Sequence, residues 1–278
     1  MKFLIFGDKG QLGSCFKEIF EKNRTRFYGV DIDHCDISDK EQVRIYVKSE
    51  KPTVILNCAA YNLVDDAETN NAPAYSANKI GTKNIALVAK EFGAFFVHYS
   101  TDYVFDGTKG KLYVESDKEN PVNEYGRSKL EGEIAIKEVL DDYLIFRLSW
   151  VYGNGKQNFI HKFTEWASKS AELNISNDEY SIPTSVDLIA QATLKALDLR
   201  LSGLFHLTAS GLASRFDWAK EIANLYKLEV SINPVSINTF NLPAKRPLNS
   251  SMSNELLSTY IGKFPNWKED LARFINKK

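Results

Sequence analysis

Short apolar runs and longer amphipathic segments alternate along the first half of the chain. The apolar runs are rich in Val, Ile, Phe and Tyr, and they predict β-strands at residues 3–6, 27–30, 54–56, 95–99 and 144–148. Between them, apolar residues recur at steps of three and four, as at Ile85, Val88 and Phe92, which predicts helices. Apolar strands separated by helices are typical of a parallel sheet with right-handed crossovers. The sequence therefore predicts an α/β fold with a doubly wound, Rossmann-like parallel sheet.

The pattern changes after Trp150. A turn at residues 152–155 is followed by helical patterns at 159–168 and 186–199 and by a strand-like run at 204–207. The tail contains several prolines, which indicate extended, loop-rich structure. We predict a dinucleotide-binding domain at residues 1–150, rejoined by segment 184–208, and a smaller, loop-rich C-terminal substrate-binding region at 151–183 and 209–278. Because ligands of open α/β sheets bind at the carboxyl ends of the strands, we expect the tail to cover that edge.

Composition narrows the classes of function. The 278 residues include 35 Lys and Arg and 36 Asp and Glu, and a net charge of −1 does not indicate a nucleic-acid partner. The N-terminal apolar run is shorter than the about 7–15 residues of a signal peptide or the roughly 20 of a membrane span. Cys15, Cys35 and Cys58 lack zinc-site spacing, as do the four histidines, and the cysteines are typical of free thiols in a reducing compartment. We expect a cytoplasmic protein with no metal, nucleic-acid or membrane partner.

Gly7, Gly10 and Gly13 lie between the first predicted strand and the first predicted helix. The first two let the backbone approach a pyrophosphate at the helix N-terminus, and the third lets helix and strand pack closely. The first two glycines are one residue further apart than in the usual dinucleotide motif, so the strand–loop–helix context carries the prediction. Asp31 follows the second predicted strand, where a carboxylate accepts hydrogen bonds from ribose hydroxyls and repels a 2′-phosphate, which favours NADH over NADPH. Weaker candidates for cofactor contact are Asp36, Ile37, Ala59, Ala60 and Tyr61.

A Tyr-x-x-x-Lys spacing can place a proton donor and a cation on one helix face. It occurs three times, as Tyr75/Lys79, Tyr125/Lys129 and Tyr152/Lys156. Reduction of a carbonyl needs a proton donor for the developing alkoxide, and a cation is expected to lower the pKa of tyrosine, ordinarily about 10, for that role. The spacing alone does not choose among the three pairs.

Position in the chain selects Tyr125 and Lys129. A turn separates Tyr152 from its lysine, and no hydroxyl cluster lies near Tyr75. Tyr125 begins a predicted helix, whereas Thr101 follows the fourth predicted strand and offers a hydroxyl to the same substrate carbonyl. We therefore predict Tyr125, Lys129 and Thr101 as the catalytic residues.

Longer motifs around these residues resemble the extended short-chain dehydrogenase/reductase superfamily. They are GDKGQLG at residues 7–13, STDYVFDG at 100–107 and YGRSKLEGE at 125–133. Further motifs, RLSWVYG at 147–153, NF at 158–159 and RPLNS at 246–250, are similar to those of the dTDP-4-dehydrorhamnose reductase family. The resemblance covers nearly the whole chain. It departs from the family at residues 177–184, where Glu179 and Ser181 replace the typical Gln and Gly.

The resemblance implies a reductase that transfers hydride from NADH or NADPH to C4 of a nucleotide-linked 4-keto-6-deoxy sugar, with dTDP-4-dehydro-L-rhamnose as the leading substrate. It implies that Tyr125 donates the proton, that Lys129 holds the nicotinamide ribose and that Thr101 tunes the proton affinity of Tyr125. The predicted cofactor-binding residues are Gly7, Gly10, Gln11, Leu12, Asp31, Asp36, Ile37, Ala59, Ala60, Tyr61, Tyr125 and Lys129. The predicted substrate-binding residues are Thr101, Asp102, Trp150, Asn158, Arg246 and Asn249.

Two alternatives stay open at this point. One is a reductase or epimerase of another nucleotide sugar, for example a UDP-linked one; an epimerase holds its NAD throughout turnover, so tightly bound cofactor after purification would favour it. The other is a non-catalytic regulatory subunit, a role that homologues of this family fill for methionine adenosyltransferase. The intact Thr101, Tyr125 and Lys129 argue against the second alternative. A homodimer is compatible with the sequence, which does not determine the oligomeric state.

Overall fold

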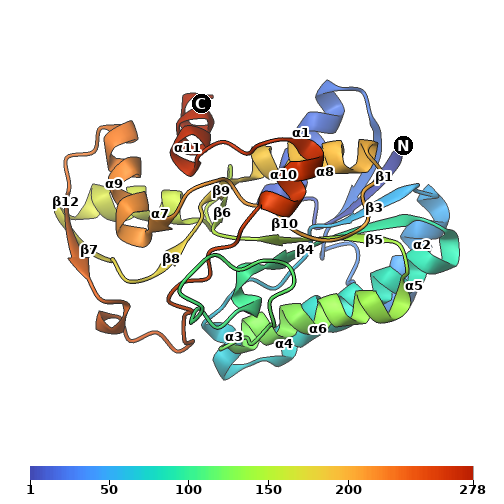
Figure 1. Ribbon diagram of the computed structural model, residues 1–278. Helices are drawn as coiled ribbons and strands as arrows, with labels where there is room; N and C mark the ends of the chain where they lie inside the picture. Colours follow the sequence, from blue (N-terminus) through green and yellow to red (C-terminus); the bar gives the residue numbers. More distant parts are fainter. Residues whose placement is uncertain (278) are drawn as a thin grey trace.

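A six-stranded parallel sheet forms the centre of the computed structural model, which describes residues 1–277 (Figure 1). Its strands are β1 (Lys2–Phe6), β2 (Arg26–Val30), β3 (Val54–Asn57), β4 (Phe95–Thr101), β5 (Tyr143–Leu148) and β10 (Gly203–His206), in the order β10-β5-β4-β3-β1-β2. Strands β2 and β3 pair with opposite sides of β1. The strand order therefore reverses beside β1, and such a reversal is where open α/β sheets bind ligands.

Helices cover both faces of the sheet (Figure 1). One face carries α2 (Lys40–Glu50), α5 (Thr82–Phe92) and α6 (Glu124–Val139), and the other carries α1 (Gln11–Lys22), α8 (Val186–Asp198) and α10 (Glu255–Ile261). Each face has its own apolar core, with Val43 and Ile136 fully buried in the first and Phe16 and Leu257 in the second. Burial on both faces explains why the strands are nearly continuous apolar runs in the sequence.

Shorter elements follow the third and fourth strands. They are α3 (Asp66–Thr69), α4 (Ala72–Tyr75), the π-helical turn η1 (Ser76–Gly81) and the 3₁₀ turn η2 (Asp102–Val104). The turns η1 and η2 both pack against α6, which begins at Glu124. These contacts place the first turn of α6 close to the carboxyl end of β4.

The remaining elements gather beyond one end of the sheet (Figure 1). They are β6 (Val151–Tyr152), α7 (Phe159–Lys169), β7 (Glu172–Ser176), β8 (Tyr180–Ser181), β9 (Thr184–Ser185), β11 (Ala213–Ser214), α9 (Arg215–Tyr226), β12 (Ser231–Val235), η3 (Ile237–Thr239) and α11 (Trp267–Asn276). The strands form three two-stranded pairs, β6 with β9, β7 with β12 and β8 with β11. A third apolar core joins these elements around Phe163, Trp218 and Trp267.

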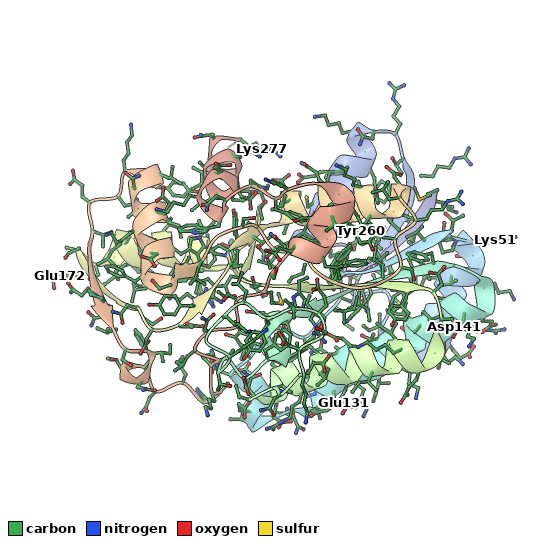
Figure 2. All side chains as sticks on the ribbon, in the orientation of Figure 1. Lys51, Glu131, Asp141, Glu172, Tyr260 and Lys277 are labelled. Carbon is green, nitrogen blue, oxygen red and sulfur yellow. The ribbon has the colours of Figure 1, made fainter. Side chains whose placement is uncertain are left out.

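The predicted fold class is confirmed. All five strands predicted in the first half are present, and the strand-like run at 204–207 is β10, which completes one edge of the sheet. Within residues 1–277 no helix is long and apolar enough to cross a membrane, and no group of three or more acidic, His or Cys side chains could hold a metal ion. Charged side chains such as Lys51, Glu131 and Asp141 point outward from the surface (Figure 2).

Candidate active site

A cavity of about 700 Å³ lies at the carboxyl ends of β1, β2 and β3, within the size range of cofactor sites. Nine of the predicted cofactor-binding residues line it: Gly7, Gly10, Gln11, Asp31, Asp36, Ile37, Ala59, Ala60 and Tyr61. The predicted residue Leu12 instead packs into the core between the sheet and α1. The cavity therefore coincides with the strand-order reversal beside β1.

Close backbone packing explains two of the three glycines. Gly7 has a φ of +80°, and a Cβ there would lie 2.5 Å from the backbone nitrogen of Ala59. A Cβ on Gly13 would lie 2.1 Å from the Gly7 carbonyl oxygen. Gly10 precedes α1 without a side-chain cap, which leaves the first N–H groups of the helix for an anionic ligand. The loop thus has the shape and the donors that a dinucleotide pyrophosphate needs.

Asn158 connects this glycine loop to the loop between β6 and α7. Its Nδ2 lies 2.8 Å from Gln11 Oε1, 2.9 Å from the Gly153 carbonyl oxygen and 2.8 Å from that of Gly155. Its Oδ1 accepts the His161 N–H at 3.0 Å and caps α7. Asn158 thus anchors the loop whose residues 154–157 line the cofactor cavity, and its predicted contact with substrate stays a prediction.

Asp31 also lines the cavity. Its Oδ2 accepts the Lys9 N–H at 2.9 Å, and its Oδ1 accepts the Ile32 N–H at 2.8 Å. Each carboxylate oxygen keeps a lone pair for a further donor, so Asp31 is still able to bind ribose hydroxyls. The Lys9 ammonium forms an ion pair with Asp33. Asp31 and Lys9 thus line the cavity, and Asp33 pairs with Lys9 beside it.

Asn78 links the loop after β3 to α6. Its Oδ1 accepts the Tyr61 N–H at 2.9 Å, and its Nδ2 donates to the Tyr61 carbonyl at 3.1 Å and to Ser128 Oγ at 2.9 Å. Gly132 lets α6 approach, since a Cβ there would lie 2.3 Å from the Asn78 carbonyl oxygen. The cofactor loop and the helix that carries the predicted catalytic pair are therefore held in one hydrogen-bonded unit.

Tyr125 and Lys129 lie one turn apart on α6 and share a face. Asn123 caps the helix by accepting the Gly126 N–H at 2.8 Å. Gly126 brings α6 against the turn after β4, because a Cβ there would lie 2.2 Å from the Tyr103 carbonyl oxygen. The Tyr103 and Tyr125 rings meet edge to face at 5.9 Å. Local packing thus sets Tyr125 beside the carboxyl end of β4, where Thr101 lies.

The environment of the pair defines its charge state. Burial raises the pKa of the Tyr125 hydroxyl to about 12, and a hydrogen bond with Thr101 opposes that rise. Burial lowers the pKa of the Lys129 ammonium to about 8, with the nearby Glu133 acting against it, and Nζ donates to the Tyr99 carbonyl oxygen at 2.6 Å. The expected lowering of the tyrosine pKa by lysine is therefore not a property of the free protein. Tyr125 is instead a firmly protonated phenol, the form that a proton donor requires.

The other two tyrosines of this spacing have different surroundings. Tyr75 donates to Glu124 Oε2 at 3.1 Å. Tyr152 is fully buried in the third core and donates to Asp270 Oδ2 at 2.9 Å. Lys156 lies apart from Tyr152 in the wall of the cofactor cavity. Neither tyrosine hydroxyl hydrogen-bonds to the residues at the end of β4.

Thr101 and Asp102 form a hydroxyl-rich cluster at the end of β4. Thr101 Oγ1 donates to Asp102 Oδ1 at 3.2 Å, and Asp102 Oδ2 accepts from Ser181 Oγ at 2.8 Å and from Ser250 Oγ at 2.5 Å. Asp102 is only 2% exposed. Burial raises the pKa of its carboxyl to about 6, although the three hydroxyls act to lower it. One buried carboxylate thus joins β4 to two segments of the C-terminal half of the chain.

Trp150 has a strained backbone conformation, and the Arg215 guanidinium packs over its ring. Its φ of +40° is rare for a bulky residue and marks a constrained position. The Arg215 guanidinium lies 3.7 Å from the ring centroid, and Glu179 Oε2 lies 3.5 Å from Arg215 Nε. The Trp218 ring stacks on Trp150 at 5.6 Å. Glu179, one of the departures from the family pattern, therefore positions a cation over a predicted substrate residue.

The remaining predicted substrate residues make contacts within the protein. Arg246 Nη2 lies 2.7 Å from Asp65 Oδ2, and its Nη1 donates to the Ala244 carbonyl oxygen at 2.8 Å. Asn249 Oδ1 accepts the Ser251 N–H at 3.2 Å. In this structure the planar fork of Arg246 is thus engaged by the loop that follows β3.

Sequence reasoning missed several residues of the site. The cavity also contains Lys9, Ile32, Cys58, Asn62, Asn154 and Lys156, and the polar contacts around the site include Asn78, Arg215 and Ser250. The position of Lys9 inside the glycine loop was a usable signal. Asn78, Arg215 and Ser250 carry no local signal, because their partners lie far away in the chain.

Fold and site together define the class of protein. A glycine loop at the strand-order reversal, a Tyr-x-x-x-Lys helix and a threonine at the end of β4 characterise an oxidoreductase of the extended short-chain dehydrogenase/reductase class. Comparison with known proteins narrows this class to one family. The family model described as the RmlD substrate binding domain matches residues 1–278, and the chain belongs to this family, whose curated relatives include dTDP-4-dehydrorhamnose reductases.

Individual relatives agree over the full length. The dTDP-4-dehydrorhamnose reductase of Escherichia coli K12 is 34% identical over 100% of this chain and 98% of its own. A dTDP-4-dehydrorhamnose reductase structure from Clostridium acetobutylicum has a TM-score of 0.97 and 37% identity, covering 100% of this chain and 99% of that one. The Bacillus anthracis enzyme, solved in complex with NADP, has a TM-score of 0.97 and 34% identity, covering 100% of both chains. A Thermus thermophilus UDP-glucose 4-epimerase at 18% identity shares the fold.

Proposed function

We propose that this protein reduces C4 of dTDP-4-dehydro-L-rhamnose, giving dTDP-L-rhamnose, with NADH or NADPH as the reductant. The single observation that carries the proposal is the position of Tyr125 and Lys129 on α6, beside Thr101 and next to the glycine-loop cavity. The full-length relatives named dTDP-4-dehydrorhamnose reductase support the choice of sugar nucleotide. An epimerase is less well supported, because the epimerase likeness is limited to the fold.

The residues of the cavity fit a dinucleotide. Gly7, Gly10 and the N-terminus of α1 would hold its pyrophosphate, and Asp31 would hold its adenosine ribose. When bound, the nicotinamide supplies the hydride. Lys129 would bind the second ribose with an ammonium that is charged below about pH 8. In this proposal Asp31 also makes NADH at least as good a reductant as NADPH, because a carboxylate repels a 2′-phosphate.

Tyr125 completes the reaction by donating its phenolic proton to the carbonyl oxygen of the sugar. The proton stays on Tyr125 until it is needed, since burial keeps the pKa of the hydroxyl high. Thr101 shares a hydrogen bond with Tyr125 and stabilises the tyrosinate that remains. Trp150, with Arg215 over its ring, is proposed to bound the sugar-nucleotide site on the side of the third core.

The test is a parallel assay of NADH and NADPH oxidation at the nicotinamide absorbance band. Each coenzyme is mixed with dTDP-linked and UDP-linked 4-keto-6-deoxy sugars, including dTDP-4-keto-6-deoxy-D-glucose, because a relative from Streptomyces niveus is named for reduction of that sugar. Preferred turnover of dTDP-4-dehydro-L-rhamnose supports the proposal. Absence of turnover with every keto sugar contradicts it and favours a regulatory subunit. The homodimer and the cytoplasmic location also stay predictions, to be tested by sedimentation and cell fractionation.

A further inference from the structure

The hydroxyl of Thr101 has one proton and two neighbouring acceptors. The structure directs that proton to Asp102 Oδ1 at 3.2 Å. The Tyr125 hydroxyl also lies within hydrogen-bonding reach of Thr101, although its own proton points to Asn62 Oδ1 at 3.5 Å. One lone pair of Thr101 Oγ1 accepts the Tyr103 N–H at 3.2 Å. A hydroxyl oxygen accepts at most two hydrogen bonds, so only one further donor can bind it. The donor that binds the second lone pair of Thr101 Oγ1 therefore decides where Thr101 directs its own proton.

We propose that Asp102 is a positioning residue that reverses the hydrogen bonds along Asp102, Thr101 and Tyr125 when it takes up a proton. With Asp102 ionised, Thr101 donates to it, and the free lone pair of Thr101 competes for the Tyr125 proton with Asn62 Oδ1, which lies 3.5 Å from the Tyr125 hydroxyl. With Asp102 protonated, its O–H donates to Thr101, which then accepts two bonds and must donate toward Tyr125 or the substrate oxygen. The Tyr125 proton is thereby released from Thr101 and turned toward the substrate. The protonated form is the one that supports reduction.

The surroundings of Asp102 suit this role better than direct substrate binding. Its Oδ2 is occupied by Ser181 and Ser250, its Oδ1 faces Thr101, and the side chain is buried. The charged and titratable groups that face the cluster are Arg215 from α9, Glu179 before β8, Arg246 from the tail, and the phenols of Tyr103 and Tyr125. Arg215 favours the ionised carboxylate, whereas burial outweighs it and raises the pKa of Asp102.

Ser181 helps to decide which oxygen of Asp102 faces Thr101. Both serines donate to Oδ2, which leaves Oδ1 as the oxygen that faces Thr101. In an Asp102→Asn variant the amide oxygen takes the place of Oδ2 beside the serines, so the amide NH₂ faces Thr101 as a permanent donor. That variant therefore imitates the protonated carboxyl at every pH. Ser181→Ala removes one donor from the carboxylate and raises the pKa of Asp102 further.

The experiment measures single-turnover hydride transfer between about pH 5 and about pH 8, with saturating coenzyme and the dTDP-linked 4-keto sugar. The wild-type rate is expected to fall as pH rises through the Asp102 titration. Asp102→Asn should lose that inflection, and Ser181→Ala should move it to higher pH. Ser149→Ala is the matched control, because this buried hydroxyl donates to the Ile182 carbonyl and should leave the inflection in place. An inflection unchanged in Asp102→Asn overturns the inference; if that variant does not fold, an unshifted inflection in Ser181→Ala overturns it.

A second measurement separates this inference from the proposed function on which it rests. Infrared difference spectra of the wild type minus Asp102→Asn, recorded without substrate, should show a protonated-carboxyl band that grows as pH falls through about 6. If the band is present but no keto sugar is reduced, the proposed function is wrong, whereas the titration of the buried Asp102 carboxyl is confirmed. With keto sugars reduced and the inflection retained in Asp102→Asn, only the inference fails. If the band is absent across the whole pH range, the inference is overturned directly.

Discussion

Arg246 and Asp65 form an ion pair across 181 positions of sequence, with Nη2 and Oδ2 2.7 Å apart. Asp65 also accepts the Ala244 N–H through Oδ1 at 3.1 Å, so a single carboxylate holds both residues of the tail. Burial acts to raise the pKa of the Asp65 carboxyl, but the Arg246 guanidinium and the Ala244 N–H together hold the pKa below its usual range. The pair fastens the tail to the loop that follows β3, beside the cofactor cavity.

Arg246→Ala is expected to raise KM for the sugar nucleotide roughly tenfold or more, since a hydrogen bond to a charged group contributes about 1.5–3 kcal/mol. The planar fork suits a substrate diphosphate, which can take the place of the Asp65 carboxylate. Coenzyme affinity should stay unchanged, and fluorescence titration with NADH checks this. Equal losses for substrate and coenzyme would show that Arg246 acts on the cofactor side.

Asp65→Asn is the matched control for this variant. It keeps the arginine and removes the charge that competes for it, so KM for the sugar nucleotide should stay the same or fall. The midpoint of urea unfolding should decrease, because the partly exposed ion pair and the tail contact are weakened. A KM that rises as much as in Arg246→Ala would mean that the intact ion pair, and not the free guanidinium, is needed for binding.

The central sheet could be predicted because its information is local. Strands β3 and β4 are buried on both faces and therefore read as apolar runs, and the run that became β10 was visible in the same way. The cofactor cavity followed from the loops at the strand ends, since Gly7 and Asp31 each adjoin a predicted strand. The division into a dinucleotide-binding domain and a substrate-binding region stays a prediction.

The contacts of the polar side chains could not be predicted in the same way. Asn158 lies 147 positions from Gln11, and only the finished fold brings their side chains to 2.8 Å. Asp102 likewise meets Ser181 and Ser250 through strand pairing and loop closure far along the chain. The residue types suggested polar chemistry, but these contacts depend on the tertiary fold, and the assignment of Asn158 to the substrate stays a prediction.

Coenzyme preference should depend on the carboxylate of Asp31. Asp31→Ala is expected to weaken NADH roughly tenfold, because it loses hydrogen bonds between a charged acceptor and the ribose, and to relieve the repulsion of NADPH. Dissociation constants of both coenzymes, measured by fluorescence, test this. Asp33→Ala is the control: its carboxylate pairs with Lys9 at the same end of the cavity but does not line it. A wild-type enzyme that strongly prefers NADPH would contradict the prediction.

Coenzyme affinity should fall at alkaline pH through Lys129. Burial lowers the pKa of its ammonium to about 8, so the charged form is present below that pH and is lost as pH rises through it. The dissociation constant for NADH is therefore expected to rise between about pH 7 and about pH 9 in the wild type. In Lys129→Met the constant should be high and nearly independent of pH over this range. A pH dependence that persists in the variant would assign the titration to another group.

Acid should destabilise the fold partly through His206, which is fully buried between β5 and the tail. Burial lowers the pKa of its imidazole to about 3, against about 6.5 when unfolded, so its contribution is complete above pH 6.5 and is lost as pH falls toward 3. Near pH 4.5 the loss amounts to about 2–3 kcal/mol. Between pH 7 and pH 4.5, His206→Gln should therefore lose less free energy of unfolding than the wild type, as measured by urea unfolding. His34→Gln is the control, since His34 is exposed, and it should behave like the wild type.

The chemical step should depend on the hydroxyl of Tyr125. Tyr125→Phe keeps the ring and its edge-to-face contact with Tyr103, so folding and coenzyme binding should survive. Single-turnover hydride transfer should slow on the order of 10²–10⁴-fold, because the general acid is lost. Tyr75→Phe is the cleaner control, since it removes only a hydrogen bond to Glu124. Tyr152→Phe removes a buried bond to Asp270 and should lower stability by about 1–3 kcal/mol without abolishing turnover. If Tyr125→Phe keeps most of the rate while either control is inactive, the proton donor is a different tyrosine and the proposed mechanism is wrong.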